Sequence, residues 1–308
     1  MDLGYFEFSL PVKDILASMA FYEAVGFERV EYAKDAGTAT LVLGDCRLGL
    51  LEGHLTPARP QLIFWQGPVE AVAAQAQRVQ LKTLVPLRAD AEGGCGLMLA
   101  DPDGNPLHIL RMTRFYPQYP AHTQSAPIER PARRPADATA GWFEASLPVQ
   151  AIAQSVAFYE ALGFATVTRD TEGTWVSLQN ADCRLGLFQG HLDPDRPQLI
   201  FWQGDLKAMA TRARTAGFGF LCEPVGQYGA FMLADPDGNP LYFIDPPGGS
   251  HPRPTQSRAA SPGAYTAAPS VWALCRSGGE ALKHPHAPEG EPRRDLQARV
   301  GQRRAVAG

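Results

Sequence analysis

The chain has 308 residues, 45% of them apolar, and a formal net charge of −4. The length favours two domains, and the apolar content is ordinary for a globular protein. Nine Lys and Arg against four Asp and Glu follow Ser250, so the first 249 residues carry a net charge of about −9. This acidic body argues against a nucleic-acid groove, and no apolar stretch is long enough to span a bilayer. We therefore expect neither nucleic-acid nor membrane partners for the body.

The N-terminus lacks a basic segment followed by an apolar run, which predicts no signal peptide. The five cysteines form no CxxC pair, and their odd number argues against a disulfide framework. Both observations favour a cytoplasmic protein.

The first predicted element is a strand, because apolar and polar residues alternate from Phe6 to Val12. Asp14 is the expected N-cap of a helix that ends at Gly26. The elements expected next are strands at Arg29–Tyr32, Ala39–Leu43 and Arg47–Leu51, a further strand at Gln61–Gln66, a helix at Val69–Val79, and strands at Gly96–Ala100 and Leu107–Leu110. The motif DPDGN predicts a tight turn between the last two strands.

The whole pattern then occurs a second time. PQLIFWQG stands at 60–67 and 197–204, and MLADPDGNPL stands at 98–107 and 232–241. A copy of this length indicates a duplicated domain, since solenoid repeats are shorter. We predict one domain at 1–115, a Pro/Ala/Arg-rich linker at 116–140, a second domain at 141–247 and a disordered basic tail at 248–308.

Two pairs of strings carry a resemblance to a known family. The first copy holds LPVKDILASMAFYEAVGF and DPDGNPLHIL, and the second holds LPVQAIAQSVAFYEALGF and DPDGNPLYFI. Their order and spacing resemble the vicinal oxygen chelate superfamily, which includes glyoxalase I, extradiol dioxygenases, and fosfomycin and bleomycin resistance proteins. The resemblance implies an α+β fold of tandem glyoxalase/bleomycin-resistance-like domains. Each domain would have two βαβββ units, whose curled mixed sheet surrounds a cleft with the helices outside.

Strand alternation decides which side chains face that cleft. If Phe6, Phe8 and Leu10 pack under the helix, the intervening side chains point the other way. The residues expected to line the cleft and bind a ligand are Glu7, Ser9, Gln61, Ile63, Trp65 and His108 in the first copy, and Glu144, Ser146, Gln198, Ile200, Trp202 and Tyr242 in the second. Apolar and aromatic walls with a few polar groups suit a small organic molecule. Glu7 and His108 are the candidate catalytic pair, acting as a general base.

The resemblance also implies four positions at which metal-dependent relatives carry ligands. They hold Glu7, Gly49, Gln61 and His108 in the first copy, and Glu144, Gly186, Gln198 and Tyr242 in the second. Glycine offers no donor, and a neutral amide is a weak ligand without better partners. We therefore favour no cofactor. The alternative is a divalent Ni, Zn, Mn or Fe ion held by Glu7, Gln61 and His108.

Without a metal, a carboxylate in a partly dry cleft needs another partner. His108 is the expected ion-pair partner of Glu7, and the Tyr242 hydroxyl is the expected donor to Glu144. The alternative is that both glutamates only satisfy buried backbone donors.

Other polar residues have simpler explanations. The aspartates of the two DPDGN motifs are expected to form turns, and Cys46 and Cys183 to act as small hydrophobic residues. His54 and His191 are interpreted as loop residues bonded to backbone.

Three functions remain open. The first is a metal-independent glyoxalase/bleomycin-resistance-like protein that binds a small molecule. The second is a metal-dependent glyoxalase-like lyase or dioxygenase, and the third is a structural or interaction protein with a degenerate cleft. The duplication predicts an internal pseudo-dimer, active as a monomer or a homodimer.

Overall fold

The computed structural model describes residues 1–53, 55, 59–90, 93–114, 126–127, 131–132, 134–190, 192, 196–222 and 229–245. The predicted linker lies partly outside these residues. The predicted tail and the two loop histidines, His54 and His191, lie wholly outside them. Among the described residues, no helix is long and apolar enough to cross a membrane.

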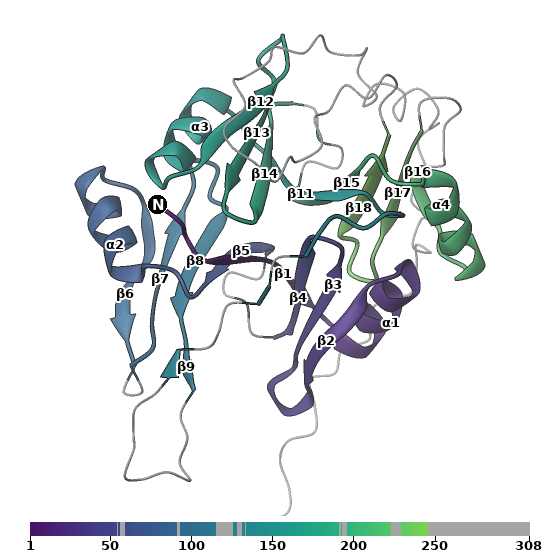
Figure 1. Ribbon diagram of the computed structural model, residues 1–308, viewed down its shortest axis with the longest axis horizontal. Coiled ribbons are helices and arrows are strands. Elements are labelled where there is room, and N and C mark those ends of the chain that lie inside the picture. The colour runs from purple at the N-terminus through teal and green to yellow at the C-terminus, as the bar shows by residue number, and fades with distance from the viewer. Residues whose placement is uncertain are drawn as a thin grey trace, which may run out of the picture.

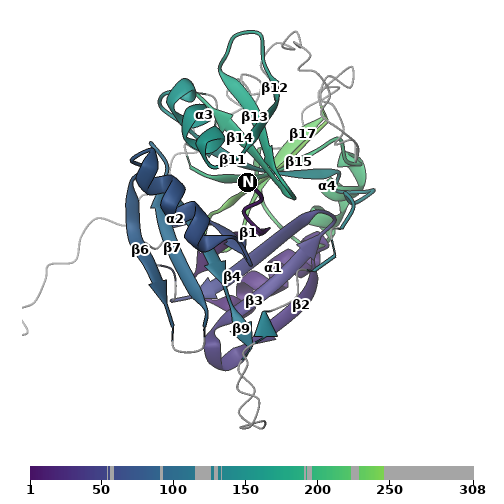
Figure 2. The same cartoon turned by 60° about the vertical axis from the view of Figure 1, so that its left-hand side comes forward.

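The first copy forms one eight-stranded mixed sheet in the order β2-β3-β4-β1-β5-β8-β7-β6. Its strands are β1 (Tyr5–Val12), β2 (Glu28–Ala33), β3 (Thr38–Leu43), β4 (Cys46–Glu52), β5 (Gln61–Trp65), β6 (Thr83–Ala89), β7 (Cys95–Ala100) and β8 (Pro106–Arg111). Its helices are α1 (Ile15–Val25) and α2 (Val69–Arg78), with a 3₁₀ turn, η1 (Lys34–Ala36). Figure 2 shows the sheet curling between β2–β3 at one end and β6–β7 at the other.

The second copy repeats this sheet in the order β12-β13-β14-β11-β15-β18-β17-β16. Its strands are β11 (Trp142–Pro148), β12 (Ala165–Arg169), β13 (Trp175–Asn180), β14 (Cys183–Phe188), β15 (Gln198–Trp202), β16 (Phe220–Cys222), β17 (Ala230–Ala234) and β18 (Pro240–Ile244). Its helices are α3 (Ile152–Ala161) and α4 (Leu206–Thr215), while the short strands β9 (Thr113–Arg114) and β10 (Ala126–Pro127) pair with each other. The two sheets confirm the predicted fold class of tandem domains built from βαβββ units.

The helix ends follow the predicted signals. The Asp14 side chain accepts hydrogen bonds from the backbone N–H groups of Leu16 and Ala17, which caps the start of α1. The helix ends at Gly26, whose φ of 121° favours glycine. The sequence patterns did not predict β6 or the short strands β9 and β10. β6 is a mostly exposed edge strand that contains Pro86, so it lacks the alternation of a half-buried strand.

The two copies share one hydrophobic core. α1 packs beside α4, and α2 lies near α3, so each helix of the first copy meets a helix of the second (Figure 1). Aromatic rings cross the boundary, with centroids 4.5 Å apart for Phe21 and Phe218, and 6.1 Å apart for Phe64 and Phe164. The two copies therefore pack against each other through one continuous apolar cluster.

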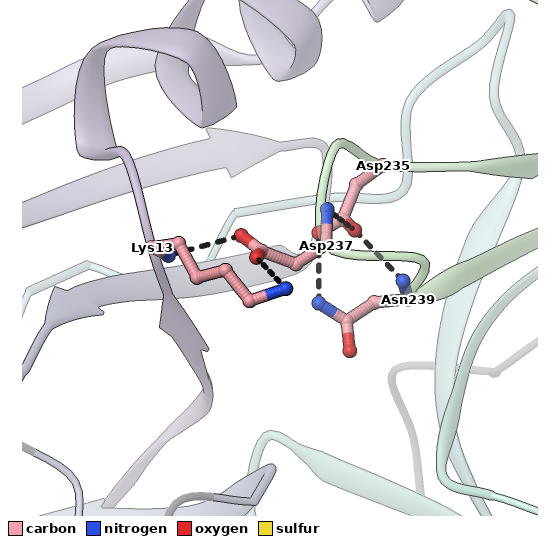
Figure 3. A network of polar contacts seen from close by, with 4 residues as sticks. All are labelled: Lys13, Asp235, Asp237 and Asn239. Atoms are coloured by element: carbon pink, nitrogen blue, oxygen red, sulfur yellow. Dashed lines mark hydrogen bonds and ion pairs between the residues drawn. The ribbon is translucent and has the colours of Figure 1, made fainter. Parts of the chain in front are cut away.

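The DPDGN turns join the copies through hydrogen bonds. Asp235 Oδ1 accepts from the backbone N–H groups of Asp237 and Asn239, which confirms the aspartate as a turn former. Its Oδ2 accepts from the Tyr22 hydroxyl of the other copy at 2.9 Å. Lys13 approaches Asp237 through both its backbone N–H and its ammonium group (Figure 3).

The opposite turn is held in the same way. Tyr159 donates to Asp101 Oδ2 at 2.9 Å, and Asp103 accepts from the backbone of Gln150 and the hydroxyl of Ser155. The repeated FYE and DPDGN motifs are therefore partners across the two copies.

Candidate functional site

The predicted site residues of the first copy lie on one face of its sheet, called here the inner face. Glu7 pairs with Ile63 across β1 and β5, and Ile63 pairs with His108 across β5 and β8. Ser9 stands opposite both Gly49 and Gln61. The other face carries the apolar residues that pack into the shared core.

The inner face of the first copy is only partly covered. Glu7, Ser9, Gln61 and Ile63 are buried, with at most 4% of their surface exposed. Trp65 and His108, together with Thr38, Arg47 and Leu110, stay partly exposed. Buried polar side chains on this face thus lie beneath aromatic and cationic side chains that are partly exposed.

The ion-pair partner of Glu7 is Arg47 rather than the expected His108. Arg47 Nε donates to Glu7 Oε2 at 3.1 Å, and the Ser9 hydroxyl donates to Oε1 at 3.1 Å. Burial raises the pKa of the Glu7 carboxyl, and the Arg47 guanidinium opposes that rise. The reason is register: β4 lies directly beside β1, and its Arg47 stands next to Glu7.

His108 lies on β8, which is not a neighbour of the β1 strand that carries Glu7. Ile63 lies between them in the sheet, and two strand spacings separate their backbones by about 10 Å. Burial alone lowers the pKa of His108, which keeps its imidazole neutral near pH 7. A neutral imidazole on this face serves as a hydrogen-bond donor and acceptor for a ligand.

Arg47 and Tyr5 belong to the inner face and were missed in the sequence. The Arg47 guanidinium carbon lies 5.4 Å from the centroid of the Tyr5 ring, and that ring stacks on Trp65 with centroids 6.4 Å apart. A signal for Arg47 was present, because the alternation that places Gly49 on this face also places the residue two positions earlier there.

The inner face of the second copy is filled. Every predicted site residue there is buried, and none has more than 4% of its surface exposed. The filling side chains form a separate apolar cluster of Trp142, Trp175, Phe188, Leu192, Ile200, Trp202, Ala230, Met232, Tyr242 and Ile244. The stacked rings of Trp142 and Trp202, 5.6 Å apart, lie in this cluster.

A few exchanges at equivalent positions account for the difference between the two faces. Thr38 pairs with Leu51 in the first copy, where Trp175 pairs with Phe188 in the second. His108 is likewise replaced by Tyr242, whose side chain is fully buried. Larger aromatic side chains thus occupy the space above the second sheet.

Glu144 is sealed beneath this cluster. The Ser177 hydroxyl donates to its Oε2 at 2.6 Å, so a serine of β13 is a donor to this carboxyl. The bond from Tyr242 stays a prediction. Burial raises the pKa of Glu144 to about 7, while the bond from Ser177 opposes the rise. Glu144 is therefore largely protonated in mildly acidic solution, unlike a carboxylate paired with a cation.

The residues at the four family positions do not fit a divalent metal. A Cβ atom at Gly49 would lie 2.5 Å from Glu7 Oε1 and 2.7 Å from the Ser9 hydroxyl, so no larger ligand fits there. The same holds at Gly186, where Glu144 Oε1 occupies the space. Arg47 already balances the charge of Glu7, and no group of three His, Cys, Asp or Glu in the described part of the chain is arranged to hold an ion.

The cysteines at equivalent turns are buried. Burial raises the pKa of both Cys46 and Cys183 well above the usual range of a thiol. They are poor nucleophiles and pack in the core, in agreement with their prediction as small hydrophobic residues.

Comparison with solved structures finds proteins of the same architecture. 2,2',3-Trihydroxybiphenyl 1,2-dioxygenase from Sphingomonas wittichii matches with a TM-score of 0.52 and 20% identity, covering 88% of this chain and 97% of that one. The Mn(II)-bound glyoxalase from Novosphingobium aromaticivorans matches with a TM-score of 0.52 and 18% identity, covering 93% and 95%. Homoprotocatechuate 2,3-dioxygenase from Arthrobacter globiformis matches with a TM-score of 0.51 and 17% identity, covering 80% and 79%.

Sequence comparisons add nothing to these matches. No family model matches the chain, and no curated protein sequence matches it. At sequence identities of 20% or less, the matches show that this chain shares the fold of these proteins, but they do not show that it shares their chemistry. The chain therefore has the fold of the vicinal oxygen chelate proteins, as its repeated motifs predict.

Proposed function

We propose that this chain is a glyoxalase/bleomycin-resistance-like protein of the vicinal oxygen chelate superfamily that binds a small organic molecule without a metal. The binding surface is the inner face of the first sheet. The observation that carries the proposal is the contrast between the copies: Trp65, His108 and Arg47 stay partly exposed, whereas Trp202 and Tyr242 are buried. Aromatic walls above a few oriented polar groups are typical of small-molecule sites.

The second copy serves as a support in this proposal. Its filled inner face matches the degenerate-cleft hypothesis, but only for this half of the chain. Its helices complete the shared core and its Asp235 turn holds α1, so it positions the first sheet.

The second candidate function is a metal-dependent glyoxalase-like lyase or dioxygenase. It is favoured by the likeness to solved structures named as dioxygenases and as a Mn(II)-bound glyoxalase. The donor set of Glu7, Gln61 and His108 stands against it. The Glu7 carboxylate is already paired with Arg47, and the remaining one of the four ligand positions holds Gly49, which has no donor side chain. Catalysis by Glu7 and His108 without a metal remains part of the prediction.

The binding proposal is tested by filling the first face as the second is filled. Thr38→Trp copies the residue at the equivalent position, Trp175, and is expected to abolish binding of any ligand found by a thermal-shift screen. Thr38→Val, which is of similar size to threonine, should retain it. Undiminished binding by a folded Thr38→Trp protein would place the ligand elsewhere.

Metal analysis separates the two candidate functions. We expect Ni, Zn, Mn and Fe to be substoichiometric after purification and after incubation with each ion. A stoichiometric ion that is lost in Glu7→Ala would overturn the metal-independent proposal and favour the lyase or dioxygenase.

The cellular setting follows from the composition and the internal symmetry. We propose a cytoplasmic protein whose two copies form an internal pseudo-dimer and whose functional unit is a monomer or a homodimer. Sedimentation of the full chain at several concentrations distinguishes these two states.

A further inference from the structure

Arg47, on the inner face of the first sheet, has N–H donors that are not engaged by Glu7. Its Nε atom is committed to Glu7, whose side chain is only 5% exposed, while the Arg47 side chain is 21% exposed. Its hydrogen bond to Glu7 uses Nε, and neither Nη atom has a hydrogen-bond partner in the described part of the chain. Because the guanidinium group is planar, the bond from Nε to Glu7 also fixes the direction in which the two Nη groups point.

An aromatic wall and a cavity lie beside this arginine. Tyr5 stands between Arg47 and Trp65, contacting the guanidinium with its ring and stacking on the indole. A cavity of about 60 Å³ opens against Tyr5 and Arg47, but not against Trp65. Its lining includes Tyr5, Val42, Asp45, Arg47, Arg134 and Asp182.

The two aspartates of this lining are already engaged. Asp45 accepts a hydrogen bond from the backbone N–H of Phe143, and Asp182 accepts one from that of Phe6. Arg134 pairs with Glu28. Arg47 and Arg134 thus both keep open donors in this lining, and of the two it is Arg47 that lies against the Tyr5 ring.

We propose that the ligand is a small aryl or arylalkyl carboxylate, whose carboxylate is bound by the two Nη groups of Arg47 and whose ring contacts Tyr5 and Trp65. This inference rests on the proposed function and names its ligand class. Paired N–H donors of a guanidinium match the two oxygens of a carboxylate, and such charge-assisted bonds exceed neutral ones in strength.

The second copy supplies an internal comparison. Its equivalent arginine, Arg184, is only 6% exposed and lies over the Trp142 ring at 4.4 Å. The arginine was retained in both copies, but only Arg47 presents an edge to a ligand. Binding of one carboxylate per chain follows.

The test compares matched probes by calorimetry and tryptophan fluorescence on the full chain. Benzoate, phenylacetate and 1-naphthoate are each paired with their neutral amide, and benzoate also with benzamidinium. At least one carboxylate is expected to bind about 10- to 100-fold more tightly than its amide, the range of a charge-assisted hydrogen bond. Arg47→Gln should remove this preference, Arg47→Lys should reduce it, and Arg29→Gln on β2 should leave it intact.

Folding of the variants is controlled separately. Because Arg47→Gln leaves Glu7 without its partner, the double variant Glu7→Gln/Arg47→Gln removes both charges and is measured beside it. The double variant should also lose the preference for carboxylates while retaining a cooperative unfolding transition.

Two results would overturn the inference, and they have different consequences. If the amides or benzamidinium bind best and Thr38→Trp abolishes that binding, the ligand class is wrong but the proposed site stands. If no probe of any charge binds, or if binding persists in Thr38→Trp, both the ligand class and the proposed function are wrong.

Discussion

The two sheets have the same strand order and nearly the same register, yet their inner faces differ. Glu7 and Glu144 occupy equivalent positions at the centre of each face. The first is paired with Arg47 under partly exposed side chains, and the second is sealed under a cluster of aromatic rings. The comparison teaches that the backbone of this fold does not decide whether the inner face is filled. A handful of side chains at the rim does.

The comparison also separates stability from function. Side chains that fill the second face add buried apolar area and stabilise the fold. The first face, where several side chains stay partly exposed, lacks part of that stabilisation. Equivalent residues of the two copies should therefore respond differently to the same substitution.

The largest difference is expected between the two equivalent tryptophans. Trp202→Ala should lower the free energy of unfolding by about 3–5 kcal/mol, because it empties a well-packed cluster. Trp65→Ala should cost only about 1–2 kcal/mol, because that indole is already partly exposed. Urea unfolding of both variants measures the difference. Equal costs would mean that the first face is as closely packed as the second.

The next effect is a dependence of stability on pH that comes from Glu144. Its pKa is about 7 in the folded protein and near 4.5 when unfolded, so the unfolded chain releases this proton first as the pH rises. Stability is therefore greatest below pH 4.5 for this group and falls until pH 7, by about 3 kcal/mol in total. Glu144→Gln should remove this slope.

The matched variant is Glu7→Gln. Burial raises the pKa of Glu7 as well, but Arg47 favours its charged form, so we expect the slope that it removes to be shallower. Unfolding midpoints between pH 5 and 8 compare the two. A steeper contribution from Glu7 would contradict the assignment of the sealed carboxyl to the second copy.

The smallest difference is expected between the hydroxyls that hold the turns. Tyr22→Phe and Tyr159→Phe each remove a hydrogen bond to a buried aspartate of the other copy and should cost about 1–3 kcal/mol. The two costs should agree, because this part of the molecule is symmetric. Tyr32→Phe, which changes a partly buried tyrosine away from both turns, is the control for loss of a hydroxyl.

Local patterns in the sequence were sufficient for the architecture. Alternation along the first strand placed Glu7 and Ser9 opposite the core, and the DPDGN motif predicted the turns. These features depend on neighbours in the sequence. β6 was missed because an exposed edge strand carries no such periodicity.

Partners across strands were harder to predict. The pairing of Glu7 with Arg47 depends on β1 lying beside β4, and the link from Tyr22 to Asp235 depends on how the copies pack. The filling of the second face depends on Trp175, a residue three strands away from Trp202 in the sheet. The alternation of apolar and polar residues predicts which face of the sheet a side chain lies on. It does not predict which side chains of other strands that side chain contacts in a curled sheet.

The central claim is that a ligand binds to the first face and not the second, and fluorine NMR tests it directly. The chain has five tryptophans, and Trp65 alone of the four in the described residues lies on the first face. With 5-fluorotryptophan incorporated and resonances assigned by single Trp→Phe variants, a saturating ligand should shift the Trp65 signal and leave those of Trp142, Trp175 and Trp202 in place. Shifts confined to the last three would contradict the account.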